Sequence, residues 1–257
     1  MNSGHDNTTP DRVGGAIEAT ARELGLQSNS SRSIALMTET TALSTRELDQ
    51  RRMIHRDDRA RPQADAFREL RTRLLALGGD QNFVTMVASV SPHSGGSFVA
   101  RNLAAAFAFD EAKTALLIDC NLRYASQHKA LATDASPGLI DYLEKPALGV
   151  PAIIRHTGIP RLRLITAGKS RETGGEYFSS FRMRATLDSL RCRYTDRYLL
   201  LDGPAVKGSP DARILSDLAD FVVLVAGYGR DTPAAIAQAA SIFDPSRFAG
   251  VVFNELP

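Results

Sequence analysis

The residues best suited to chemistry lie in a turn-rich loop between an apolar run and a helical segment. Residues 83–90 predict a buried strand, and residues 97–109 predict a helix. A strand, a glycine-rich loop and a helix in this order are typical of a phosphate-binding loop, whose backbone N–H groups face the phosphates. The candidate nucleotide-binding residues here are His93, Ser94, Gly95, Gly96, Ser97 and Phe98.

One position of this loop departs from the motif. A phosphate-binding loop carries Gly-Lys-Ser/Thr where the helix begins. The sequence reads Gly95-Gly96-Ser97, so a glycine stands where the phosphate-binding lysine belongs. Two interpretations stay open from the residues alone. The loop is either a working nucleotide site or a site that keeps the fold without the function.

Two aspartates end apolar strands further along the chain. Asp119 lies in the run 114–121, and Asp202 follows the run 198–201. Ligands of parallel α/β sheets bind at the carboxyl ends of the strands, so both acids should meet the loop at one edge. A single aspartate at the end of a strand is weak evidence for such a site, because aspartate often occurs there as a helix cap. Together the features favour a phosphate and Mg²⁺ site, with Asp119 and Asp202 as candidate catalytic residues and Ser97, Asp119 and Asp202 as metal ligands.

Predicted strands alternate with predicted helices along most of the chain. The strands are expected at 83–90, 114–121, 161–167, 198–201, 221–226 and 250–253. The helices are expected at 63–77, 97–109, 139–144, 151–156, 176–195, 212–218 and 234–243. Alternation of this kind implies right-handed crossovers. We therefore predict an α/β fold, a P-loop NTPase-like three-layer sandwich with a mostly parallel central sheet.

Residues 1–62 differ in composition from the rest of the chain, because they are rich in Gly, Ser, Thr and Asn and poor in apolar residues. An amphipathic pattern predicts a short helix at 11–26, and Ser44 with Glu47 predicts a capped helix that ends near Ile54. Residues 56–62 read as a linker. We divide the chain into a mostly flexible region, 1–62, and an α/β domain, 63–257.

The overall composition excludes several classes of protein. The 31 basic and 29 acidic residues give a net charge of +2, which does not favour nucleic acid as a partner. Two cysteines, Cys120 and Cys192, indicate a reducing compartment rather than a disulfide framework. The sequence has no apolar run of the roughly 18 residues that a membrane span needs and no signal pattern at its start, so we expect a cytoplasmic protein.

The predicted helix 63–77 has an apolar and a charged face. Ala66, Phe67, Leu70, Leu74 and Leu77 recur at helical spacing. Asp65, Arg68 and Arg71 follow one another at a spacing of three and therefore share one side. Such a face is usually solvated, and an interface is the alternative.

Several further motifs occur in a fixed order. They are Ala64-Asp65-Ala66-Phe67-Arg68-Glu69-Leu70-Arg71-Thr72, Leu117-Ile118-Asp119-Cys120-Asn121-Leu122-Arg123, Gly138-Leu139-x-Asp141, Leu201-Asp202-Gly203-Pro204 and Val251-Val252-Phe253-Asn254. With them, residues from about 65 to 254 resemble the cytoplasmic kinase domain of bacterial tyrosine kinases. These kinases are MinD-like P-loop proteins that serve capsule and exopolysaccharide synthesis.

The resemblance implies roles for particular residues. Asp65-x-x-Arg68-x-x-Arg71 resembles an element associated with ring-like self-assembly, which favours the interface interpretation of that helix. Asp119 and Asp202 correspond to the acids of the second and third Walker elements. Asn254 corresponds to the asparagine that faces the nucleotide base, which makes it a further cofactor-binding candidate.

The departures from the family pattern lie at positions that bind the nucleotide or take part in catalysis. Gly96 replaces the lysine, Phe98 replaces the second hydroxyl residue of the loop, and Asn121 replaces an acid. The C-terminal tyrosine cluster, the usual target of autophosphorylation, has no counterpart in the sequence. Losing a phosphate-binding lysine removes charge-assisted bonds of about 1.5–3 kcal/mol each. We therefore expect ATP and Mg²⁺ to bind weakly or not at all.

Three functions compete on this basis. The favoured one is a degenerate kinase-like subunit that regulates or scaffolds exopolysaccharide production. It would be a cytoplasmic protein peripheral to the inner face of the membrane, where it meets a polysaccharide co-polymerase and forms oligomers. The second is an active tyrosine autokinase with an atypical loop, for which Arg101 or a partner's arginine supplies the charge. The third, a MinD/ParA-like ATPase, is disfavoured because no upstream lysine lies in residues 83–98.

Overall fold

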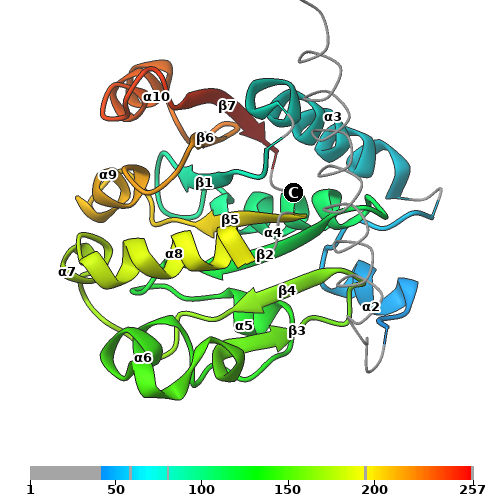
Figure 1. The fold of residues 1–257 in the computed structure, drawn as a ribbon. Helices are drawn as coiled ribbons and strands as arrows, with labels where there is room; N and C mark the ends of the chain where they lie inside the picture. The colour runs from blue at the N-terminus through cyan, green and yellow to red at the C-terminus, as the bar shows by residue number, and fades with distance from the viewer. Residues whose placement is uncertain (1–41, 58–59, 80, 194–195, 256–257) are drawn as a thin grey trace, which may run out of the picture.

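A seven-stranded sheet forms the centre of the computed structural model, which describes residues 42–57, 60–79, 81–193 and 196–255. The strands lie in the order β3-β4-β2-β5-β1-β6-β7, and Figure 1 shows them stacked from β7 at the top to β3 at the bottom. The bounds are β1 Val84–Ser89, β2 Thr114–Asp119, β3 Ile154–His156, β4 Leu162–Ile165, β5 Arg197–Asp202, β6 Phe221–Gly227 and β7 Phe248–Asn254.

Neighbouring strands of this sheet run parallel except at one edge. The pairs β4·β2, β2·β5, β5·β1, β1·β6 and β6·β7 are parallel, whereas β3 pairs antiparallel with β4. The predicted helix at 151–156 is therefore wrong. Residues 150–153 form one 3₁₀ turn, after which the chain turns back as the edge strand β3. The mostly parallel α/β fold is confirmed.

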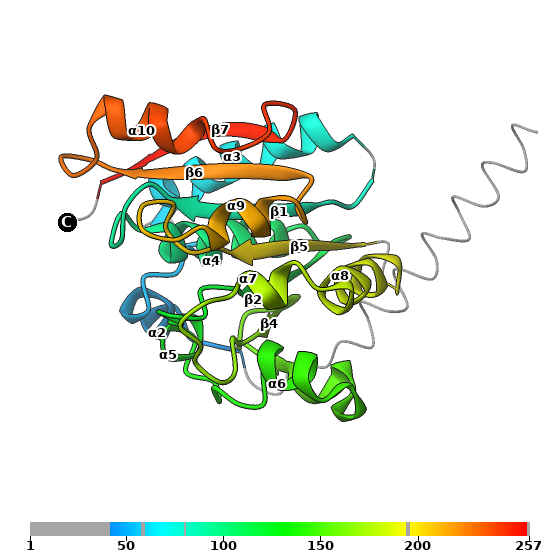
Figure 2. The same cartoon turned by 90° about the vertical axis from the view of Figure 1, so that its left-hand side faces the viewer.

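Helices cover both faces of the sheet and make the three predicted layers. Apolar side chains of α3 and α4 pack on one face, and those of α6, α8, α9 and α10 pack on the other. In Figure 2, α8 and α9 lie in front of the sheet while α3 and α4 lie behind it. The bounds are α2 Thr45–Gln50, α3 Arg61–Gly78, α4 Gly96–Ala108, α5 Gln127–Ala130, α6 Leu139–Glu144, α7 Gly175–Phe178, α8 Phe181–Arg193, α9 Asp211–Ser216 and α10 Pro233–Ala240.

Helix α3 buries a narrower face than its pattern predicts. Phe67 and Leu74 are buried, but Ala66 and Leu77 are exposed, and Ala64 is buried in place of Ala66. The helix lies along α4, where Phe67 meets Phe98 with ring centroids 6.0 Å apart. Only the sides of α3 that touch α4 and the sheet are covered, and a periodic pattern alone does not fix how wide that contact is.

The described part of the N-terminal segment is packed on the domain. The predicted helix at 11–26 lies outside the described residues. Ser44 and Glu47 form the predicted capping box, in which the Ser44 N–H donates to Glu47 Oε2 at 2.9 Å, and α2 ends at Gln50 rather than near Ile54. Met53 and Ile54 then enter the core beneath α4. The apolar pair anchors residues that the composition alone assigns to a flexible region.

None of the helices in the described ranges is both long enough and apolar enough to cross a bilayer.

Asn102 should anchor this N-terminal segment. Its buried side chain accepts the Ile54 N–H at 2.7 Å and donates to the Arg52 carbonyl at 3.0 Å. Asn102→Leu leaves both backbone groups unpaired and should cost about 2–4 kcal/mol of unfolding free energy, measured in urea. Limited proteolysis should cut residues 42–57 first. The exposed Gln63→Leu is the control, and equal stability of the two variants would contradict this role.

Candidate functional site

The phosphate loop keeps the backbone shape that anion binding needs. Gly95 has φ 93° and precedes Gly96, the first residue of α4, and no side chain caps this helix. The first N–H groups of an uncapped helix point out of its end and attract anions. His93 has φ 66°, a conformation that is unusual for a residue with a side chain. The loop is thus built to present backbone donors.

Ser94 and Asn254, two of the predicted nucleotide contacts, hold the loop from behind. The Ser94 hydroxyl donates to Asp231 Oδ2 at 2.6 Å, and the Asn254 amide donates to the Ser94 carbonyl at 3.2 Å. A Cβ on Gly95 would lie 2.0 Å from the Asn254 amide nitrogen, so only glycine fits there. Neither Ser94 nor Asn254 lines the cavity in front of the loop.

The two substituted positions of the loop are tightly packed. A Cβ on Gly96 would lie 3.2 Å from that of Ser89, which is close enough to require a small shift of β1 or α4. Phe98 turns its ring toward Phe67 of α3 and carries the Arg101 guanidinium over it, 5.2 Å from the ring centroid. Arg101 is therefore engaged beside the loop.

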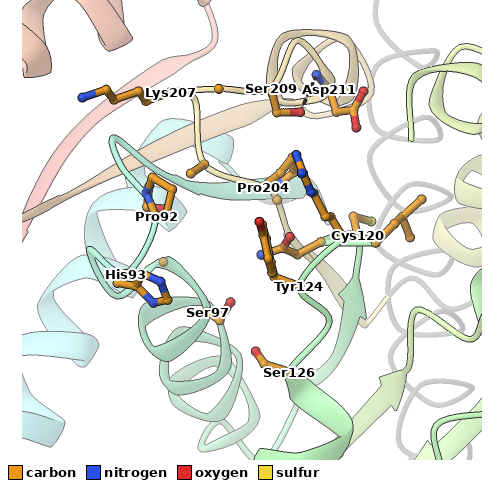
Figure 3. Close-up of a pocket in the computed structure, with 18 of the residues that line it drawn as sticks. Pro92, His93, Ser97, Cys120, Tyr124, Ser126, Pro204, Lys207, Ser209 and Asp211 are labelled. Atoms are coloured by element: carbon orange, nitrogen blue, oxygen red, sulfur yellow. Dashed lines mark hydrogen bonds between the residues drawn. The ribbon is translucent and has the colours of Figure 1, made fainter. Parts of the chain in front are cut away.

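A cavity of about 750 Å³ opens in front of the loop. Its walls come from the phosphate loop, from the segment after β2 and from the segment after β5; they include His93, Gly95, Gly96, Ser97, Phe98, Cys120, Asn121, Arg123, Tyr124, Gly203, Pro204 and Lys207. Figure 3 shows Ser97 at the start of α4 and Tyr124 across the cavity from it. The Lys207 side chain extends away from both, while Arg123 stacks on Tyr124 with 5.5 Å between guanidinium carbon and ring centroid.

Asp119 and Asp202 lie side by side, as the strand ends predict. They are register partners on β2 and β5, and both are fully buried. Asp119 accepts three backbone N–H groups: that of Asn121 at 3.2 Å and those of Ser126 and Gln127 at 3.1 Å each. Burial and the nearby Asp202 charge raise the pKa of Asp119 to about 8, although the three backbone hydrogen bonds act to lower it. Asp119 thus organises the segment after β2.

Asp202 is held by side chains instead. Gln127 donates to its Oδ2 at 2.6 Å, while its Oδ1 is buried without a partner. Burial raises the pKa of Asp202 to about 6, although the hydrogen bond from Gln127, the neighbouring Ser97 hydroxyl and the charge of Arg101 oppose the rise. Burial in turn lowers the pKa of Arg101. One carboxylate oxygen of Asp202 therefore has no donor among the described residues.

Gln127 is the site residue that the sequence did not indicate. It begins the four-residue helix α5, which no periodic pattern predicts, and it is fully buried. Its amide also donates to the Ser97 carbonyl at 2.9 Å, so one side chain joins α4, α5 and β5. The sequence contains only a slight indication of this role, since Gln127 is a polar residue eight positions after Asp119.

The residues present fit a magnesium ion at one position only. No group of three or more His, Cys, Asp or Glu side chains able to hold a metal occurs in the described ranges. Mg²⁺ needs fewer protein ligands, since it is often held by one or two carboxylates and by phosphates. The unpartnered, buried Oδ1 of Asp202 suits this role, with Ser97 beside it. Asp119 does not, because its oxygens already accept backbone N–H groups.

Strand, loop and helix together define a P-loop NTPase-like fold in which Gly96 stands at the position of the motif's lysine. No protein-family model matches the chain. The chain is 32% identical over 195 residues to the tyrosine-protein kinase wzc of Salmonella typhimurium, which covers 75% of this chain and 27% of the relative. It is also 32% identical over 198 residues to the putative tyrosine-protein kinase EpsB of Ralstonia solanacearum, covering 76% and 26%.

Solved structures that resemble this chain include a kinase domain and a MinD ATPase. The VpsO kinase domain superposes with a TM-score of 0.68 at 26% identity over 76% of this chain and 95% of that one. The cell division ATPase MinD of Pyrococcus furiosus, at 0.54 and 19% identity over 66% and 70% of the two chains, shares the fold alone. The homologues of this chain are bacterial tyrosine-protein kinases, which confirms the predicted resemblance. The chain spans about a quarter of the length of these curated relatives.

The buried acids predict how stability depends on pH. A carboxyl whose folded pKa is raised stabilises the fold below its unfolded pKa, and that contribution is lost as the pH rises through the folded pKa. Because the pKa of Asp202 is raised to about 6 and the pKa of Asp119 to about 8, the wild-type protein should lose stability as the pH rises from about 4 to 8.

Asp202→Asn keeps an acceptor for Gln127 and removes one of the two adjacent charges. It should be more stable than wild type at pH 8 by about 1–3 kcal/mol and closer to it at pH 5, measured by urea unfolding. The exposed Asp188→Asn is the control. A variant that is less stable than wild type at every pH would contradict this account.

Proposed function

We propose that this protein is a degenerate bacterial-tyrosine-kinase-like subunit that regulates or scaffolds exopolysaccharide biosynthesis and export. The observation that carries the proposal is a phosphate loop that keeps its backbone shape while its cation position is Gly96, packed against Ser89. Homology to kinases such as wzc and EpsB supports the family and the exopolysaccharide setting. The loss of catalysis is our inference from the site.

Phosphoryl transfer depends on positioning and on neutralising charge, so its cations carry much of the rate. Three cations near the loop are engaged or turned away. Arg101 lies over Phe98 beside Asp202, Arg123 stacks on Tyr124, and Lys207 points away from Ser97. A nucleotide would therefore rest on backbone N–H groups with little positive charge, which supports weak ATP binding and slow or absent transfer.

The proposed partner is the cytoplasmic part of an inner-membrane polysaccharide co-polymerase, with the protein peripheral at the inner face of the membrane. We place the contact, or self-association, on α3 at Asp65, Arg68 and Arg71. Two of these residues already pair with each other: Arg68 donates to Asp65 at 2.7 Å. Arg71 donates to the Ala106 carbonyl at 2.8 Å, which makes it part of the packing between α3 and α4.

An active autokinase is the second candidate, and one observation favours it. Ser97 and the unpartnered oxygen of Asp202 are retained where a magnesium ion would be held. Bound Mg²⁺ would neutralise phosphate charge there. The chain's own residues would still have to replace the lysine, and Arg101, which lies beside Asp202, is a candidate.

The purified protein should show no tyrosine autophosphorylation with Mg·ATP. Gly96→Lys should raise nucleotide affinity about tenfold to hundredfold, because a lysine adds charge-assisted bonds to phosphate. Gly96→Ala is the matched control, since it adds the same Cβ near Ser89 without the charge. Isothermal titration with ATP measures the affinities. Phosphotyrosine on wild type that vanishes in Asp202→Asn would establish the autokinase instead.

The same variant separates the two functions in cells. Deletion of the gene should reduce exopolysaccharide output under either function. Asp202→Asn should leave output normal if the protein is a scaffold and should behave like the deletion if it is an enzyme. Protein abundance is measured alongside, so that a loss of output is not mistaken for a loss of folding.

Charge reversal on α3 tests the interface. Arg68→Glu should change the sedimentation profile or the membrane recruitment of the protein, because it places repelling acids on the proposed contact face. Arg73→Glu is the matched control: Arg73 lies on the same helix, its side chain is 75% exposed and it pairs with Glu69. Equal behaviour of the two variants would assign Arg68 to a solvated surface.

A further inference from the structure

We propose that two copies of this chain associate through strand β7, whose outer edges pair antiparallel about a two-fold axis at Val252. The proposal goes beyond the proposed function, which places self-association on α3, and it concerns a separate surface at the edge of the sheet. The partner is a second copy of the chain, and the contact is a continuous sheet that runs from one copy into the other.

The two edges of the sheet differ in their protection against pairing with another chain. Native edge strands are commonly short or charged. Strand β3 has three residues and carries Arg155 and His156. Strand β7, at the top of Figure 1, has seven residues, Phe248–Asn254, and none of them is charged. The preceding Arg247 donates to two backbone carbonyls just after α9, at 2.9 and 2.7 Å, so its charge does not guard this edge.

The side chains of β7 are also less covered than those of the inner strands. Strands β1, β2 and β5 are buried along their whole length, whereas residues 248–252 of β7 are partly exposed. Val251 packs with the apolar cluster on the α10 side, and Val252 packs with the cluster on the α3 side. Phe253 is 65% exposed. A further strand beside β7 would therefore cover apolar surface on both faces.

The backbone of β7 turns donors and acceptors to the outer side. Successive residues of a strand turn their N–H and C=O groups to opposite edges. The Asn254 carbonyl accepts the Tyr228 N–H at 2.9 Å, so Asn254 faces β6. By alternation Val252 also faces β6, whereas Val251 and Phe253 face outward. Among the described residues no strand lies on that side of β7, so these outward groups can pair with another chain.

The outward residues match each other when β7 meets a second copy. A two-fold axis at Val252 places Val251 of one copy opposite Phe253 of the other, and such a pair exchanges both backbone hydrogen bonds. The two side chains then lie on one face, where an aromatic ring beside a β-branched side chain stabilises the pair. The register shift at Ala249 lies outside the paired residues. Strand β7 is thus complementary to itself.

The absence of charge also favours a second copy as the partner. A two-fold interface brings the same patch of both copies together, so any charge on it meets its own like. Residues 248–254 have no charged side chain. Helix α10 lies beside β7 in Figure 1 and would approach its own copy, and none of its eight residues is charged. Both elements can therefore meet their copies without repulsion.

Disulfide trapping tests the register of this pairing. At the axis Val252 faces its own copy in a non-hydrogen-bonded pair, whose Cα atoms lie about 4.5 Å apart, within reach of a disulfide. Val252→Cys should therefore give a disulfide-linked dimer under mild oxidation, measured on a non-reducing gel. Val251→Cys is the matched control and should give little dimer, because Val251 faces Phe253 of the other copy. Both variants carry Cys192→Ser, which removes the exposed native thiol.

Sedimentation velocity tests the association itself. Between about 1 and 100 μM the wild-type protein should shift from monomer to dimer. Phe253→Lys puts a charge on the paired edge and should raise the dissociation constant about tenfold or more. Phe181→Lys is the matched control: Phe181 is 85% exposed on α8, so the same change there should leave the dissociation constant unaltered.

A wild-type protein that stays monomeric over this range overturns the proposal, as does equal cross-linking of Val251→Cys and Val252→Cys. Equal dissociation constants for Phe253→Lys and Phe181→Lys overturn it too. Arg68→Glu separates this contact from the one proposed on α3, since the disulfide of Val252→Cys should still form in that background. A disulfide that is lost with Arg68→Glu would assign the self-association to α3 instead.

Discussion

The burial of two carboxyl groups side by side is the constraint on which this site depends. Asp119 and Asp202 are register partners at the ends of β2 and β5, with no solvent access. A buried acid needs donors or a cation. The protein supplies three backbone N–H groups to Asp119 and the Gln127 amide to Asp202. Those bonds fix the segment after β2 and, through Gln127, the start of α4.

Because these bonds come from the chain itself, the loop keeps its shape without a lysine. Helix α4 is held by packing, with Ala100, Leu103 and Ala104 fully buried against the sheet. Ser94 and Asn254 fix the loop from behind. Folding and catalysis therefore draw on different residues. The chemistry can be lost at Gly96 while the apolar pattern that makes the fold remains, as expected when function resides in a site grafted on a fold.

The difference between the residues that make the fold and those that would catalyse the reaction also explains how the chain compares with its relatives. Identity of about 30% to bacterial tyrosine-protein kinases and a TM-score of 0.68 to a kinase domain rest on the sheet and its helices. The curated relatives are about four times as long as the matched segment. A scaffold needs only the shape and surface of the domain, whereas a kinase also needs cations that neutralise phosphate charge.

The sequence by itself determined the alternation of strands and helices, the phosphate loop before α4 and the meeting of Asp119 with Asp202. These features follow from local periodicity and from the rule that parallel strands end at one edge. Only the tertiary structure decided that Gln127 holds Asp202 and that Asn254 supports the loop rather than lining the cavity. These contacts join residues 75 and 160 positions apart in the chain. A buried hydrogen bond depends on where packing places two side chains, and local pattern carries no information about that distance.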